Sequence, residues 1–340
     1  MRNSLYFIGL SFLIISCGSQ KTVTSNKTKS GTGPTAVVHK PEMPERPKVQ
    51  HEGHEDFYKV NIADATKNNN TISYGSIVSA NPAGYKVVKT YFPSLAQNYR
   101  QKYIILHYTA LDDDKSVTVL TQQTVSAHYL VNNLGDRDIY QLVDENKRAY
   151  HAGISAWRTD KALNDTSIGI EIVNGGYKSD ASGAKIFPDF DPEQIKKVAA
   201  LVKDIANRYM IPATNILGHS DIAPTRKQDP GPKFPWKKLY DDYQIGMWYD
   251  DATKQDIMTT QVLNDPYFGT NLSTPQFIFK YQTALQTFGY DIQPSGLLDD
   301  ATKKTIEAFQ YHFRPEKYDG VMDAETWVIL QSLIKKYPSK

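Results

Sequence analysis

Two segments of this chain are apolar at nearly every position, and they constrain its fold more than any other feature. Residues 102–109 read KYIILHYT and residues 166–173 read TSIGIEIV. A strand exposed on one face would alternate apolar and polar residues, whereas a continuous apolar run is typical of a central strand that is covered on both faces. The sequence therefore predicts two central strands in a sheet that lies between other layers.

A long helix is predicted after the second strand. Asp191 provides an N-cap and Pro192 occupies the first helical position. The residues that follow place apolar side chains on one stripe at helical spacing: Ile195, Val198, Ala199, Val202 and Ala206. Strands that alternate with helices predict an α/β layer fold for residues 85–246, with a short helix near the end of this part.

A smaller helical unit is predicted over residues 272–337. Thr274 and Pro275 begin one helix, and Gly289 ends it. Two segments then repeat the pattern Gly-x-x-Asp-x-x-Thr, in which Asp299 and Asp323 are placed to cap the next two helices. Residues 247–271 are interpreted as a linker, so each part is expected to fold alone.

The N-terminus predicts export. A positive residue and a short apolar run precede Ile14-Ile15-Ser16-Cys17, so residues 1–16 are interpreted as a signal peptide. The run resembles a lipobox, in which Cys17 would be lipidated and hold the protein to a membrane; an ordinary secretory signal is the alternative. Residues 17–52 are poor in large apolar side chains and are interpreted as a flexible tether, and residues 53–84 as an extension of uncertain role.

Charge and cysteine content exclude several classes of function. The 340-residue chain has a formal net charge of +2, which provides no basic field for nucleic acid. Cys17 is the only cysteine, so no intramolecular disulfide can form, and a metal site in the folded body would need histidine or carboxylate ligands. No feature of the sequence predicts an oligomeric state.

Four histidines lie in the predicted α/β part: His107, His128, His151 and His219. A single histidine of this kind is more often a packed, hydrogen-bonded residue than a metal ligand. His107 lies near the end of a central strand, and His219 follows Gly218, which permits a turn that would direct the imidazole inward. A catalytic zinc needs three protein ligands and one open position. Asp229 lies between Lys227 and two prolines and could be the third ligand, although a plain turn aspartate is the alternative.

Glu171 is the most unusual carboxylate, because it lies in the middle of an apolar strand. A buried carboxylate that lacks a partner is costly, or its pKa rises, and a general base next to a metal-bound water needs such a position. The alternative is a buried ion pair, for which Lys227 is a candidate partner; Lys227 could instead stabilise an oxyanion.

Several motifs in one order resemble a known family. The segments ILHYTA, VSAHYLV, IYQLVDENKRAYHAGISAW, SIGIEIVN and ILGHSDIAPTRKQDPGPKFPW are together similar to the zinc-dependent N-acetylmuramoyl-L-alanine amidases, which are related to phage endolysins and peptidoglycan recognition proteins. The resemblance implies a central mixed β-sheet flanked by helices over about residues 85–245. FQYHFRPEKYDGVMDAETWVIL resembles a three-helix peptidoglycan-binding domain.

The resemblance also implies roles for individual residues. His107, His219 and Asp229 match the ligands of one Zn²⁺ ion, Glu171 the catalytic glutamate, and Lys227 the lysine that stabilises the transition state. His128 and His151 match recurrent positions that are not usual ligands. The implied reaction is hydrolysis of the amide between N-acetylmuramic acid and L-alanine, with peptidoglycan and muropeptides as partners. The alternatives are a peptidoglycan-binding protein without catalysis and an amidase restricted to anhydro-muropeptides.

A cellular location follows from the lipobox interpretation. Ser19 and its neighbours provide neither an aspartate retention signal nor an acidic export patch after Cys17. We therefore expect a lipid anchor in the outer membrane that faces the periplasm.

Overall fold

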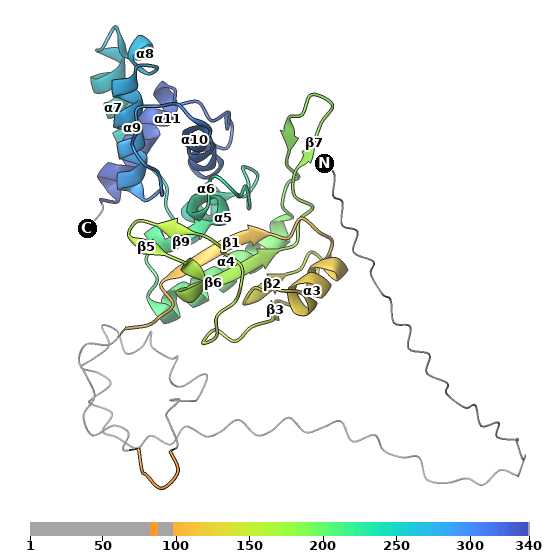
Figure 1. Ribbon diagram of the computed structural model, residues 1–340. Helices are drawn as coiled ribbons and strands as arrows, with labels where there is room; N and C mark the ends of the chain where they lie inside the picture. Colours follow the sequence, from red (N-terminus) through yellow and green to blue (C-terminus); the bar gives the residue numbers. More distant parts are fainter. Residues whose placement is uncertain (1–81, 88–97, 339–340) are drawn as a thin grey trace, which may run out of the picture. The chain divides into compact units, whose positions relative to one another are not determined.

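The computed structural model describes residues 82–87 and 98–338. The predicted signal peptide, Cys17, the tether and nearly all of the N-terminal extension lie outside the described residues. The described part contains a mixed β-sheet with flanking helices, followed by further helices toward the C-terminus (Figure 1). In the described ranges no helix is both long enough and apolar enough to cross a membrane.

The central sheet has the strand order β3-β2-β6-β1-β9. Its two longest strands are β1 (Tyr103–Tyr108) and β6 (Ser167–Ile172), which pair in parallel as the two apolar segments predicted. The strands β9 (Ile216–Gly218) and β2 (Tyr129–Val131) extend the parallel part, and only β3 (Tyr140–Gln141) is antiparallel. The predicted mixed sheet is therefore confirmed.

Helices flank the sheet, and α4 (Pro192–Tyr209) lies along one face (Figure 1). The side chain of Asp191 accepts hydrogen bonds from two amides of the first turn, and Pro192 occupies the first helical position, so the predicted start is confirmed. The apolar stripe of α4 is buried in the core. The shorter helices are α3 (Asp113–Gln122), α5 (His219–Ile222) and α6 (Trp236–Tyr243).

Short elements connect these layers. Two small hairpins are formed by β4 (Ala156–Trp157) with β5 (Asp160–Lys161), and by β7 (Lys178–Ser179) with β8 (Lys185–Ile186). Single turns of 3₁₀ helix precede β6 and β9, namely η1 (Leu163–Asp165) and η2 (Ala213–Asn215).

The C-terminal helices begin earlier than the sequence predicts. The interpretation of residues 247–271 as a linker is wrong, because they form α7 (Asp251–Ile257), the π-helical segment η3 (Met258–Leu263) and α8 (Phe268–Asn271). Met247, Trp248 and Ile257 are buried, and the Lys254 ammonium bonds Glu325 at 2.9 Å. These elements pack on the three predicted helices, and we call residues 247–338 the helical unit.

The predicted helices of the helical unit are α9 (Pro275–Phe288), α10 (Asp300–Phe313) and α11 (Ala324–Lys336). Each begins at the cap that the sequence predicts. The side chains of Thr274, Asp299 and Asp323 each accept a hydrogen bond from an amide in the first turn of the helix that follows.

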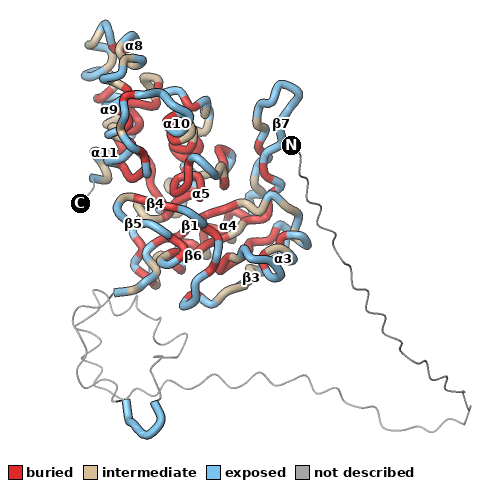
Figure 2. The backbone as a smooth tube through the Cα atoms, viewed as in Figure 1, coloured by how far each residue is buried: buried red, intermediate tan, exposed pale blue. Residues whose placement is uncertain are grey.

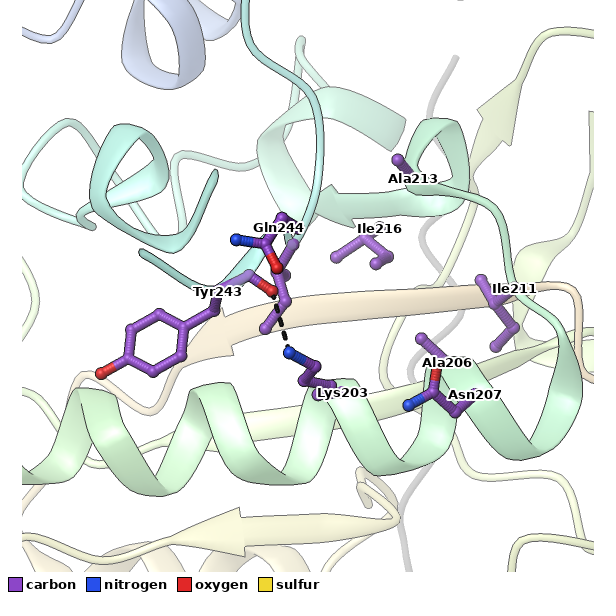
Figure 3. Close-up of a pocket in the computed structure, with 9 residues that line it drawn as sticks. Lys203, Ala206, Asn207, Ile211, Ala213, Ile216, Tyr243 and Gln244 are labelled. Atoms are coloured by element: carbon purple, nitrogen blue, oxygen red, sulfur yellow. Dashed lines mark hydrogen bonds between the residues drawn. The ribbon is translucent and has the colours of Figure 1, made fainter. Parts of the chain in front are cut away.

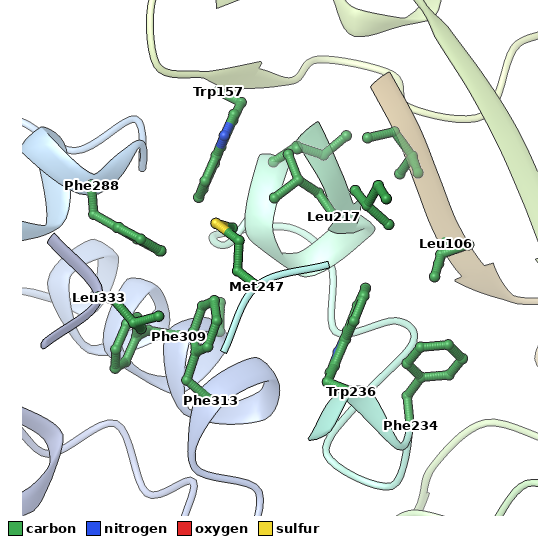
Figure 4. Packing of buried hydrophobic residues seen from close by; sticks show 14 of the residues in the cluster. Leu106, Trp157, Leu217, Phe234, Trp236, Met247, Phe288, Phe309, Phe313 and Leu333 are labelled. Atoms are coloured by element: carbon green, nitrogen blue, oxygen red, sulfur yellow. The ribbon is translucent and has the colours of Figure 1, made fainter. Parts of the chain in front are cut away.

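One apolar core extends through both parts of the chain. Figure 2 shows buried segments running from the strands into α9, α10 and α11. Figure 4 shows Met247 between Leu217 of β9 and the rings of Phe288 and Phe313, all of which belong to one cluster of buried side chains. The two parts share this core, which argues against the expectation that each part folds alone.

Candidate active site

The sheet brings two predicted site residues together. In the parallel pairing of β1 with β6, the partner of His107 is Glu171. Paired residues of neighbouring strands direct their side chains to the same face, so both side chains lie on one side of the sheet. His219 enters from the adjacent edge, because it directly follows β9, which pairs with β1.

His107, His219 and Asp229 direct three atoms to one point. The two Nδ1 atoms lie 2.9 Å apart, and each lies 3.0 Å from Asp229 Oδ2. The ligands of a tetrahedral zinc are separated by about 3.3 Å when the bonds are about 2.0 Å long. The triangle therefore has the size of one face of a zinc coordination sphere, and all three residues are buried.

Hydrogen bonds fix the protonation of His107. The chain of contacts runs from His107 Nε2 to His151 Nδ1 at 3.0 Å, and from His151 Nε2 to Ser167 Oγ at 3.1 Å. Ser167 in turn donates to the carbonyl oxygen of Leu163, which can only accept. Each preceding group must therefore donate toward Ser167, so His107 carries its proton on Nε2 and directs the lone pair of Nδ1 to the cluster.

The same argument applies to His219. Its Nε2 lies 3.1 Å from the carbonyl oxygen of Ala152, which can only accept, so Nε2 carries the proton. Arg226 donates to the same carbonyl at 2.7 Å and holds it in place. Both imidazoles thus direct Nδ1 toward the Asp229 carboxylate, with Nε2 held by the protein behind it, which is the arrangement of a metal site.

Glycine is required behind this arrangement. A Cβ atom on Gly169 would lie 2.4 Å from Cγ of His151, which is closer than real contacts allow. Side chains alternate between the two faces of β6, so Gly169 and Glu171 lie on the same face. The missing side chain of Gly169 leaves room there for the His151 ring. His128 supports the same strand, because its Nδ1 accepts a hydrogen bond from the amide of Gly169.

Burial sets the pKa values of the cluster. Burial and the neighbouring His219 lower the pKa of His107 to about 4, so His107 is neutral near pH 7. Burial also places the pKa of His151 well below its ordinary value. Although burial alone would raise it, the contacts with His219 and His107 hold the pKa of Asp229 well below its ordinary value.

Glu171 has the opposite environment. Its Oε2 atom is inaccessible to solvent and has no hydrogen-bond partner among the described residues. Burial, followed by the negative charge of Asp229, raises the pKa of Glu171 to about 8, and Lys227 opposes this rise only weakly. Within the described ranges Glu171 Oε2 has no partner, and Lys227 acts on Glu171 only through its charge, so the alternative of a buried Glu171–Lys227 ion pair is wrong.

A cleft of about 340 Å³ opens over these residues. Glu171, His219, Lys227 and Asp229 line it, together with Tyr108, Tyr150 and residues of α3. The cleft supplies space for a substrate beside the three ligand atoms. It also leaves the cluster open on one side, as a catalytic metal requires.

Comparison with known proteins gives the family. The N-acetylmuramoyl-L-alanine amidase model matches residues 97–232. The amidase AmiD of Escherichia coli (strain K12) is 44% identical over 243 residues, which are 70% of this chain and 84% of AmiD. The chain belongs to the N-acetylmuramoyl-L-alanine amidase family. It is therefore an enzyme of the amidase class.

Solved structures of amidases agree with this assignment. A complex of Escherichia coli AmiD with anhydro-N-acetylmuramic acid-L-Ala-D-gamma-Glu-L-Lys has a TM-score of 0.67 and 40% identity, and the match covers 76% of this chain and 97% of AmiD. AMPDH3 of Pseudomonas aeruginosa with an anhydromuramic pentapeptide has a TM-score of 0.62 and 39% identity, over 77% of this chain and all of that chain. Both matches extend beyond the sheet into the helical unit.

The peptidoglycan binding domain model matches residues 276–330 of this amidase, within the helical unit.

A second recess lies away from the candidate active site, between α4 and the end of α6 (Figure 3). There Lys203 donates to the carbonyl oxygen of Tyr243 at 3.5 Å. The lining of this recess contains no histidine or carboxylate, so it lacks the groups that hydrolysis would require.

The structure adds site residues to those that the sequence predicts. His151 contacts His107 directly, and the main chain of Ala152 contacts His219. His151 had a signal in the sequence, because it matches a recurrent position of the family, whereas no pattern indicates a carbonyl acceptor. Asp221 is also buried in the site region, and two of its three hydrogen-bond donors belong to the helical unit.

Proposed function

We propose that this protein is a zinc-dependent amidase that hydrolyses the bond between N-acetylmuramic acid and L-alanine in peptidoglycan. The observation that supports it best is the combination of three converging ligand atoms with the half-buried Glu171, whose inaccessible Oε2 atom is unpaired, in the same cleft. A structural histidine cluster would not need a carboxyl group with a raised pKa beside it.

Zinc fits this donor set. Two imidazole nitrogens and one carboxylate oxygen, without thiolate, are ligands of catalytic zinc sites, and a fourth position stays open to the cleft. Zinc bound here would lower the pKa of a water molecule and polarise the substrate carbonyl. His107, His219 and Asp229 would hold it.

Glu171 and Lys227 would perform the proton transfers and the charge stabilisation. With its raised pKa, Glu171 is suited to take a proton from the attacking water and to return it to the departing amine of L-alanine. Lys227 lines the same cleft and would donate to the oxyanion that develops on the lactyl carbonyl.

The two candidate substrates, the intact wall and anhydro-muropeptides, differ in the form of the muramic acid sugar. Both solved relatives named above were captured with anhydro-muramic peptides, which supports anhydro-muropeptides as substrates of this chain as well. A match to a peptidoglycan binding domain supports action on the polymer. We propose that both are cleaved, since the amide bond is the same in each.

We further propose that the protein is a lipoprotein of the cell envelope. The support is the lipobox-like run that ends at Cys17 and the polar, Pro- and Gly-containing stretch behind it, all of which lie outside the described residues. A tether of this kind would let a lipid-held enzyme reach the wall from the outer membrane.

Metal removal tests the zinc assignment. Purified protein is dialysed against chelator and offered anhydro- and reducing-end muropeptides, and the release of stem peptide is followed by mass spectrometry. We expect activity to be lost with chelator and restored by one equivalent of zinc. Full activity in a preparation that elemental analysis shows to be free of metal would contradict the proposal.

A further inference from the structure

Asp221 connects the candidate metal site to the helical unit. It is fully buried and lies two residues after His219, in the single turn α5. Its Oδ2 accepts from the amide of Gly218 at 2.8 Å and from His312 Nδ1 at 2.7 Å, and its Oδ1 accepts from the hydroxyl of Tyr290 at 2.7 Å. Two of its three donors therefore come from the helical unit.

The turn around Asp221 holds two of the three proposed ligands. His219 is the first residue of α5, and the amide of Ser220 donates to the carbonyl oxygen of Asp229 at 2.8 Å. The bond from Gly218 to Asp221 closes the turn where β9 ends. A change in the Asp221 carboxylate would thus move the backbone that positions both His219 and Asp229.

Aromatic packing fixes the two donors of the helical unit. His312 stacks on Trp236 with ring centroids 3.9 Å apart and planes 14° apart. The rings of Tyr290 and Trp157 form a T-shaped pair with centroids 5.1 Å apart. The main chains of the two parts also touch here, because the amide of Arg158 donates to the carbonyl oxygen of Gly289 at 2.7 Å. A Cβ atom on Gly289 would lie 2.7 Å from the Trp157 ring.

We propose that Asp221 is a positioning residue for the metal site and that the helical unit, through Tyr290 and His312, is a structural part of that site. This inference rests on the proposed zinc function. It assigns the helical unit a role in addition to any contact with peptidoglycan. A freely tethered binding module would need no buried hydrogen bonds to a turn that holds metal ligands.

A matched pair of substitutions separates positioning from simple stabilisation. Tyr290 and Tyr311 are both buried tyrosines of the helical unit whose hydroxyls donate to a carboxylate, but Tyr311 donates to Glu307 on its own helix and accepts from Lys185, which is no part of the metal site. Tyr290→Phe and Tyr311→Phe therefore remove the same group at similar burial. Only the first removes a donor from Asp221.

The experiment measures zinc affinity of the full-length chain by competition with a chromogenic chelator, together with kcat, KM and thermal unfolding of the metal-free protein. We expect Tyr290→Phe to weaken zinc binding about tenfold and to lower kcat, with a smaller effect on KM. For Tyr311→Phe, zinc affinity and kcat should stay within about twofold of the wild-type values. The two variants should lose similar amounts of thermal stability.

A second comparison uses His312. His312→Asn keeps an N–H donor close to the position of Nδ1, whereas His312→Leu removes it. We expect zinc affinity to be largely retained by His312→Asn and lost by His312→Leu. Equal zinc affinity and kcat for Tyr290→Phe and Tyr311→Phe would overturn the inference. A wild-type chain that bound no zinc would overturn the zinc assignment itself, and this inference with it.

Discussion

Replacing Glu171 with glutamine tests whether this carboxyl group is held in the state that a general base requires. Burial raises the pKa of Glu171 from its ordinary 4.5 to about 8 in the metal-free protein. The folded state therefore retains a proton that the unfolded chain has already released at neutral pH. Stability is thus lost as the pH rises from 4.5 to about 8, and no further loss comes from this group at higher pH.

The magnitude follows from the same shift. Between about pH 5 and about pH 8.5 the wild-type chain would lose at most ~4 kcal/mol of unfolding free energy through Glu171. Because Glu171 borders an open cleft, water reduces this value, and we expect ~2 kcal/mol. In the variant, the glutamine amide group has no hydrogen-bond partner at the position where Oε2 of Glu171 has none. This lowers the unfolding free energy by ~1–3 kcal/mol at every pH.

Urea unfolding of wild type and Glu171→Gln, both with chelator, measures this difference at the two pH values. The unfolding free energy of the variant, relative to that of wild type, should rise by ~2 kcal/mol between the acid and the alkaline pH. Other titrating groups are common to both proteins, and the pKa of Asp229 lies below this range, so their contributions cancel. An unchanged difference would refute the reasoning, since Glu171 would then be equally ionised in both states. With zinc added, we expect the variant to bind metal but to lose activity ~10²–10⁴-fold.

Three further outcomes are expected. His151→Leu leaves the Nε2–H of His107 without its acceptor, so competition with a chelator should show zinc binding that is ~10–100-fold weaker. Unchanged zinc affinity would show that the bond to His151 does not hold the ligand. A chain that ends after Gly246 exposes the shared core and removes both donors of Asp221, so circular dichroism should show a destabilised protein and muropeptide cleavage should fail; wild-type rates would contradict this. Cys17→Ala should move the protein from the membrane to the soluble fraction with full activity, and membrane association that survived a high-salt wash would exclude lipidation as the anchor.

Local sequence patterns predicted the parts of the fold that depend on local physics. The continuous apolar runs became β1 and β6, and the caps at Asp191, Thr274, Asp299 and Asp323 begin their helices. In each case the signal lies within a few residues of the structure that it determines. A cap bonds the next turn, and a strand's burial appears in its own composition.

Candidate ligands were also predicted, but their geometry was not. The position of His107 at the end of a strand and of His219 after a glycine indicated side chains directed inward. The pairing of His107 with Glu171 depends on the register of two strands that lie far apart in the sequence. The acceptors behind the ligands, His151 and the carbonyl of Ala152, depend on the path of a loop that has no periodicity.

The failed linker prediction has a physical reason. Residues 247–271 are rich in polar and small side chains, and only isolated apolar residues such as Met247, Trp248 and Ile257 reach the core, without the stripe that predicts a buried helix. Their burial is decided by α11 and β9, which are distant in sequence. Tyr290 and His312 of the same helical unit donate to Asp221. The segment that the sequence suggests is a flexible connection is therefore part of the core that the helical unit shares with the sheet, and the proposed ligands His219 and Asp229 lie beside the turn that this unit contacts.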